Sequence, residues 1–230
     1  AATAEMMSKA KPKAIVQRLM GPRTDVYKKT SDREFVLDQA TLVKSFSSSP
    51  QDLKLLLTSK GTGEAVVDVA IKAVEDALPG GESFLKHIAI AESKMGGMQG
   101  TYRKRSFDVK TGKDLSGGSS MWQLDPVGFD DTQNKGDHKG LPAKWKIIKD
   151  KFGIDWEKVK YDDLDIPLIG AIAARLFLMN IPLKKKDAKG NVIEVYGPLP
   201  TKKKFKTARA LLNAQGAYWK KHYNRSGEGT

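Results

Sequence analysis

The sequence predicts a mainly α-helical protein with one small β element. Apolar residues recur at helical spacing in several segments, and Pro or Gly residues close most of those segments. Only the stretch 183–196 suggests a β-hairpin, which turns at 189–191. The 230 residues, 40% of them hydrophobic, are enough to form a real core, and the chain contains no internal repeat.

Two parts of the chain are expected, a basic N-terminal arm or helical extension at 1–60 and the main domain at 61–230. Helices are predicted at 51–58, 62–78, 82–95, 141–152, 166–180 and 202–224, and another is expected to open after Asp125-Pro126. Gly216 is a candidate break in the last of these helices.

Two segments stand out from this helical pattern. Gly96 to Gly118 is long, irregular and rich in glycine, and a loop of this length inside a domain is usually functional. Ile166 to Pro182 is the most apolar run, but Arg175 interrupts it. We therefore expect a buried helix there and no membrane span.

The composition limits the class of partner. Lys and Arg number 40 against 27 Asp and Glu, which gives a net charge of +13. Such a surface attracts polyanions, whether nucleic acid, an anionic membrane or a bacterial cell wall, and charge alone does not choose among them. The absence of cysteine excludes disulfides and thiol catalysis. The histidines lack metal-ligand spacing, which argues against a zinc site, and neither a metal nor a cofactor is predicted.

The segment HIAIAESKMGG, residues 87–97, carries the first candidate for chemistry. At helical spacing Glu92 shares an apolar stripe with Leu85 and Ile88, just before two glycines end the helix. A carboxylate in such a position is either paired with a cation or kept protonated for a purpose, because burial disfavours its charged form.

Later motifs give this glutamate a context. Ala91-Glu92-Ser93 is followed by a Gly-rich stretch and then by GGSSMWQLD at 117–125, GAIAARLFL at 170–178 and YWKKHYN at 218–224. In this order the motifs resemble those of the soluble lytic transglycosylases and goose-type lysozymes, and the last is similar to the form in virion-associated lytic proteins of tailed phages. The resemblance covers about residues 82–230. Ser120 stands where the family usually has a second glycine, and Phe177 where it has a tyrosine.

The resemblance implies a lysozyme-like fold and cleavage of the β-1,4 bond between N-acetylmuramic acid (MurNAc) and N-acetylglucosamine (GlcNAc) in peptidoglycan. Glu92 would be the catalytic acid and would then, as a carboxylate, help to form a 1,6-anhydro product. The implied substrate-binding residues are Ser93, Ser120, Met121, Gln123, Asp125, Tyr223 and Asn224.

The expected partners are peptidoglycan glycan strands and other proteins of a phage virion, with no specific nucleic acid. The N-terminus AATAEMMSKAKPK lacks the apolar stretch of a secretory signal. That absence fits an enzyme that a virion delivers to the periplasm and cell wall of a bacterium.

Three other functions stay open. A hydrolytic muramidase would add a second carboxylate, for which Asp108, Asp114 and Asp125 are the candidates. A catalytically inactive virion protein would only bind the wall. A basic nucleic-acid-binding protein would fit the charge, but the chain has no recognised nucleic-acid motif.

Overall fold

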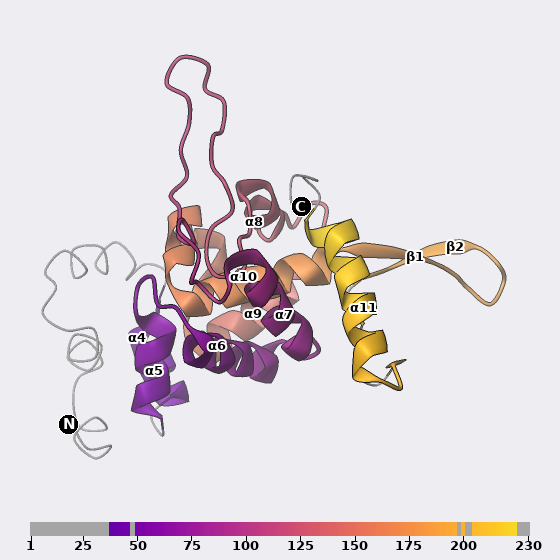
Figure 1. Ribbon diagram of the computed structural model, residues 1–230, viewed down its shortest axis with the longest axis horizontal. Helices are drawn as coiled ribbons and strands as arrows, with labels where there is room; N and C mark the ends of the chain where they lie inside the picture. The colour runs from indigo at the N-terminus through magenta and orange to yellow at the C-terminus, as the bar shows by residue number, and fades with distance from the viewer. Residues whose placement is uncertain (1–36, 47–48, 197–198, 201–203, 225–230) are drawn as a thin grey trace, which may run out of the picture.

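The computed structural model describes residues 37–46, 49–196, 199–200 and 204–224, and this part of the chain is mainly helical (Figure 1). The predicted fold class is thus confirmed at that level, while residues 1–36 of the predicted N-terminal arm lie outside the described residues. The elements in chain order are α4 (Gln39–Ser45), α5 (Pro50–Leu57), α6 (Glu64–Ala77), α7 (Glu82–Ser93), α8 (Pro126–Asp131), α9 (Leu141–Phe152), η1 (Trp156–Lys158), η2 (Tyr161–Asp165), α10 (Pro167–Asn180), β1 (Pro182–Lys186), β2 (Val192–Tyr196), α11 (Ala208–Tyr218) and the π-helical turn η4 (Trp219–Tyr223).

Helix α10 lies in the middle of the helical core (Figure 1). Its sequence PLIGAIAARLFLMN is apolar all round, and nearly every side chain is buried against α5, α6, α7, α8 and η2. The one charged residue, Arg175, donates from Nε to the carbonyl of Leu78 at 2.9 Å and from Nη2 to that of Pro79. It thereby satisfies carbonyl groups at the end of α6. Across the described ranges, no helix has both the length and the hydrophobicity needed to cross a membrane.

Helices α4 and α5 belong to the same core as the rest. Leu42, Leu53 and Leu56 are buried in it. Helix α4 packs on α9, and α5 packs on α6 and α10. Within the described residues, α4 and α5 therefore share one core with helices that follow residue 60.

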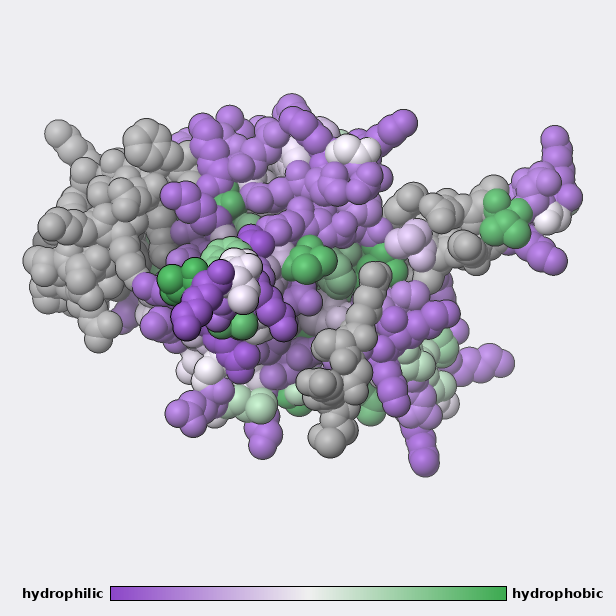
Figure 2. Space-filling view, turned by 90° about the horizontal axis from the view of Figure 1, so that it is seen from above, coloured by the Kyte–Doolittle hydropathy of each residue, from purple (hydrophilic) through white to green (hydrophobic). Residues whose placement is uncertain are grey.

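Two segments project from the helical body (Figure 1). Strands β1 and β2 pair antiparallel with Pro182 opposite Tyr196, and the side chain of Asp187 closes their turn by accepting from Asn191 N at 2.9 Å. The loop at 96–118 rises away from the helices, and Figure 2, seen from above, looks onto its end. Val109 is fully exposed there, so the outer part of the loop adds nothing to the core.

Helix α11 is not broken at Gly216, contrary to the sequence prediction. The α-helix continues through this glycine to Tyr218, and the backbone then widens into the π-helical turn η4. Thr207 caps the start of the helix by accepting from Ala210 N at 3.2 Å. The aromatic residues of the C-terminal motif consequently sit at the end of one continuous helical segment.

Candidate active site

Glu92 lies in the last turn of α7, where the chain turns sharply away. Leu85 and Ile88, its predicted neighbours on the stripe, are buried in the core. Lys94 follows with a left-handed φ of 50°, and Gly96 has a φ of 89°. Left-handed residues end a helix. The carboxyl group is therefore held at the edge of the core, next to the end of the helix.

Burial and one hydrogen bond set the ionisation of Glu92. Partial burial raises the pKa of its carboxyl, because the charged form loses solvation. Trp219 Nε1 donates a hydrogen bond of 2.7 Å to Oε1 of Glu92, which opposes part of that rise in pKa. No Lys or Arg of the described segments forms an ion pair with it. Of the two alternatives for this residue, the structure favours a carboxyl that keeps its proton to higher pH.

Residues 117–124 form a tight loop next to Glu92 in the fold. The amide of Gln123 donates to the carbonyl of Ser120 at 3.1 Å and closes a turn. Gly118 packs against this turn so closely that a Cβ atom on it would lie 2.2 Å from the carbonyl oxygen of Gln123. Only glycine fits at position 118, which explains one glycine of the motif.

Side chains from elsewhere in the fold hold the carbonyl groups of this loop in place. Three of them donate hydrogen bonds: Ser93 to Met121 at 2.7 Å, Tyr161 to Leu124 at 3.0 Å and Tyr223 to Trp122 at 2.7 Å. The indole of Trp122 is itself fully buried and donates to the carbonyl of Leu85 at 3.0 Å. The loop is thus a fixed platform between α7, η2 and η4.

Three residues predicted to bind substrate lie in the core instead. Ser93, Ser120 and Met121 are each 0% exposed. Ser93 holds the loop, and Ser120 Oγ accepts from Trp122 N at 3.2 Å. The prediction of direct substrate contact is therefore wrong for these three residues, which build the platform. Ser120 also has a φ of 71°, a left-handed conformation that glycine adopts most easily.

A cleft of about 700 Å³ opens beside the platform. Five predicted site residues line it: Glu92, Gln123, Asp125, Tyr223 and Asn224. They come from α7, the platform loop, the start of α8 and the region of η4. The fold thus brings together the residues of three motifs that are far apart in the sequence.

Other polar residues of the cleft were not predicted from the sequence. They are Asp130, Asp131, Asn134, His138 and Asn180. Nε2 of His138 lies 2.7 Å from Oδ1 of Asp131, and Asn180 donates to the carbonyl of Asp131 at 3.1 Å. The only sequence signal is the adjacent pair Asp130-Asp131, which lies in the segment where a helix is expected to open after Asp125-Pro126. Despite the net charge of +13, no described Lys or Arg lines the cleft.

Asp125 is the one candidate second carboxylate that shares the cleft with Glu92. Its Oδ1 accepts from Gly128 N at 2.6 Å and caps the start of α8. Asp108 instead closes a turn in the outer loop by accepting from Thr111 N at 2.7 Å. Asp114 is placed in the same loop and does not line the cleft. Asp125 therefore has a structural role whatever its chemistry.

The side chain of Gln123 is also held by hydrogen bonds to the backbone. Its Nε2 donates to the carbonyls of Thr101 and Ser120, both at 2.7 Å, and its φ is 47°. The amide nitrogen is thus oriented inward toward the loop. An amide with its nitrogen fixed in this way has its oxygen available as an acceptor with a defined direction.

Tyr223 acts as a neutral anchor at the edge of the cleft. Burial raises the pKa of its phenol well above the ordinary value, and the carboxylates of Glu92 and Asp125 add to that rise. The ring packs edge to face on Phe177, with 5.5 Å between ring centroids. The hydroxyl therefore keeps its proton and donates to the platform, and it is not a base at neutral pH.

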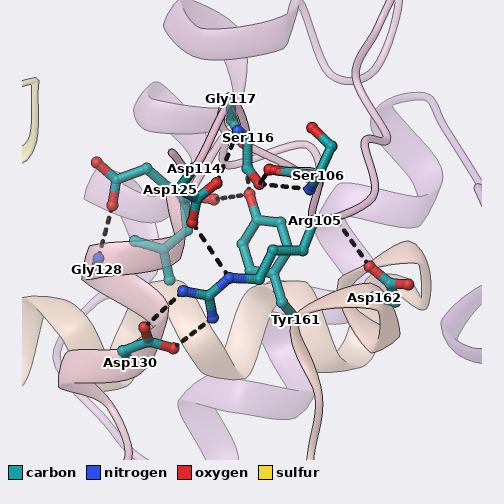
Figure 3. Close-up of polar contacts among 11 residues, drawn as sticks. Arg105, Ser106, Asp114, Ser116, Gly117, Asp125, Gly128, Asp130, Tyr161 and Asp162 are labelled. Carbon is teal, nitrogen blue, oxygen red and sulfur yellow. Dashed lines mark hydrogen bonds and ion pairs between the residues drawn. The ribbon is translucent and has the colours of Figure 1, made fainter. Parts of the chain in front are cut away.

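Arg105 fastens the base of the long loop beside the cleft (Figure 3). Its guanidinium donates to both carboxylate oxygens of Asp130 at 3.1 Å and to Asp114 at 3.3 Å. Its backbone amide donates to Asp162 at 3.0 Å. Since Asp130 also lines the cleft, this bidentate pair links the loop to the cleft wall.

We expect Arg105→Ala to loosen this loop while leaving the fold intact. The ion pairs are partly exposed, so the free energy of unfolding should fall by only about 1 kcal/mol. Amide hydrogen exchange in residues 104–116 should nevertheless become faster than in the wild type. Lys110→Ala, at an exposed loop position, is the control and should leave exchange at 104–108 unchanged. Unchanged exchange in the Arg105 variant would show that this residue does not hold the loop.

Comparison of the chain with protein-family models, with curated proteins and with solved structures found no match. The residues of the cleft, above all Glu92, are therefore what supports a function.

Proposed function

We propose that this protein is a lytic transglycosylase with a lysozyme-like fold that cleaves the MurNAc–GlcNAc β-1,4 bond of peptidoglycan. The observation that carries the proposal is the partly buried Glu92 carboxyl, whose pKa is raised, at the edge of a cleft lined by amide, hydroxyl and carboxylate groups. A general acid for this reaction has to hold its proton near neutral pH. Delivery by a phage virion to the bacterial cell wall is part of the same proposal.

The proposed reaction needs only one carboxyl group. Glu92 donates its proton to the glycosidic oxygen, the C1–O bond breaks, and its electron pair stays on the departing GlcNAc oxygen. The Glu92 carboxylate then takes the proton of the muramoyl C6 hydroxyl, whose oxygen bonds to C1. The products are a 1,6-anhydromuramoyl end and a free GlcNAc hydroxyl, and no water is consumed.

The charge distribution supports a glycan over a nucleic acid as the occupant of the cleft. The lining includes the carboxyl groups of Glu92, Asp125, Asp130 and Asp131 and, within the described residues, no Lys or Arg. Nucleic-acid binding depends on cations that neutralise phosphates, so a phosphate backbone would be repelled there. The basic surface outside the cleft suits attraction to an anionic cell wall.

Incubation with purified peptidoglycan tests the proposed activity. The wild type is expected to release soluble muropeptides, detected by chromatography of the supernatant. Co-sedimentation with peptidoglycan in the same samples measures binding separately. Binding without any release would contradict the enzyme and favour a structural virion protein that only binds the wall.

A hydrolytic muramidase is the second candidate, because Asp125 lies in the same cleft as Glu92. The variant Asp125→Asn distinguishes a hydrolytic muramidase from a transglycosylase. Asparagine caps a helix about as well as aspartate, so the variant should preserve α8. A transglycosylase should keep at least about half of its activity in this variant. A hydrolase that uses Asp125 to activate water should lose activity by about a hundredfold or more.

A further inference from the structure

The side chain of Trp219 contacts the candidate acid directly. Its Nε1 lies 2.7 Å from Oε1 of Glu92, although 127 positions separate the two residues in the chain. Trp219 is the first residue of the π-helical turn η4, which also brings Tyr223 to the platform. Single π-helical turns are rare and occur often at functional sites.

Helix α11 is fixed to the helix that carries Glu92, so this contact has a defined geometry. Tyr218 packs edge to face on Phe84 of α7, with ring centroids 5.4 Å apart. Gln215 is buried. Its Oε1 lies 2.5 Å from Nδ1 of His87, and its Nε2 donates to Oγ of Ser83 at 3.1 Å. These anchors on α7 hold the indole N–H against the carboxyl group.

The hydrogen bond distinguishes the two oxygens of the Glu92 carboxyl. An indole N–H is a donor only, so Oε1 has to be the acceptor. In the neutral carboxyl, one oxygen is a carbonyl and the other carries the proton, and the carbonyl oxygen is the better acceptor. The proton is therefore favoured on Oε2.

We propose that Trp219 is a positioning residue that fixes Oε1 of Glu92 as the carbonyl oxygen, so that Oε2 carries the proton delivered to the substrate. This inference rests on the proposed role of Glu92 as the acid. The other titratable groups that share the cleft with Glu92 are Asp125, Asp130, Asp131, His138 and Tyr223. The hydrogen bond to Glu92 comes from none of these.

Nuclear magnetic resonance tests the contact without any assay of activity. The chain has only four tryptophans, so its ¹H–¹⁵N spectrum holds four indole signals, and Trp219→Phe identifies the one that matters. That signal should move with pH along the same titration curve as the ¹³C signal of the Glu92 carboxyl. In Trp219→Phe the pKa of Glu92 should rise further, because the charged form loses its donor.

Kinetics test whether the contact positions the acid. We expect kcat of Trp219→Phe to fall by about tenfold or more, with KM within about twofold, because the carboxyl can turn away from the productive geometry. The alkaline limb of the pH profile should move to higher pH, since the acid stays protonated longer. Trp145→Phe is the matched control, because it removes a buried indole that donates to Thr132 outside the cleft, and its profile should not move.

The outcomes separate this inference from the proposed function. An indole signal of Trp219 that ignores the titration of Glu92, or a Glu92 pKa that is the same in both proteins, would overturn the positioning role. A fall in kcat with an unmoved pH profile would also overturn it, because a purely structural role predicts that result. If the wild type has no activity while the two signals titrate together, the contact stands and the proposed function fails.

Discussion

Glu92→Gln is expected to abolish the release of muropeptides, with a loss of about a thousandfold or more. Glutamine keeps the shape of the side chain, and its amide oxygen can still accept from Trp219. It has no proton to give to a glycosidic oxygen, and general acid catalysis by one group contributes about 10²–10⁴-fold. Initial rates on purified peptidoglycan measure the effect. The control is Glu64→Gln on α6, whose carboxylate pairs with Lys86 outside the cleft and should leave the rate unchanged.

The same variant should be at least as stable as the wild type at pH 8. Burial raises the folded-state pKa of Glu92 above its ordinary value of 4.5, so ionisation of the carboxyl costs stability as the pH rises through that pKa. Glutamine carries no such cost. The difference in Tm between the variant and the wild type should therefore be close to zero below the ordinary pKa and grow with pH. A difference that shrinks as the pH rises would contradict the raised pKa.

Gly118→Ala should have the largest effect on stability. The new Cβ would lie 2.2 Å from the carbonyl oxygen of Gln123, which is backbone and cannot move away as a flexible side chain could. We expect a loss of about 3 kcal/mol in the free energy of unfolding, or a fall of roughly 10 °C in Tm. Activity should fall together with stability. The loop that the new Cβ atom displaces holds Gln123, which lines the cleft.

Gly216→Ala is the matched control for that substitution. Gly216 lies in the exposed face of α11, and a Cβ atom there would meet nothing within 4 Å. Alanine should stabilise the helix by up to about 0.8 kcal/mol. Thermal unfolding of both variants gives the comparison, and an equal Tm for Gly118→Ala and the wild type would show that the platform loop is not as tightly packed as its geometry requires.

The sequence was sufficient to predict what depends on local pattern. The burial of helix α10 followed from its uniform hydrophobicity, and the partial burial of Glu92 followed from its place on the stripe with Leu85 and Ile88. The break at Gly216 was wrong because glycine only weakens a helix by about 1 kcal/mol, and packing of α11 on α7 outweighs that cost.

Contacts between distant elements could not be predicted in the same way. The hydrogen bond from Trp219 to Glu92 exists only because α11 docks on α7. Asp131 lines the cleft at the end of α8, which packs on α10, and His138 lies beside it in contact with its carboxylate. The predicted substrate contacts of Ser93 and Ser120 were wrong for a related reason, because both side chains are buried. A sequence motif does not say which of its residues touch a ligand and which build the loop beneath it.

Mass spectrometry of the fragments that the wild type releases from purified peptidoglycan tests the central claim most directly. A lytic transglycosylase predicts fragments with 1,6-anhydromuramoyl ends, each lighter than the hydrolytic product by one water. Reducing muramic ends would contradict the single-carboxyl mechanism and assign the chemistry to a hydrolase, with Asp125 as the first residue to replace.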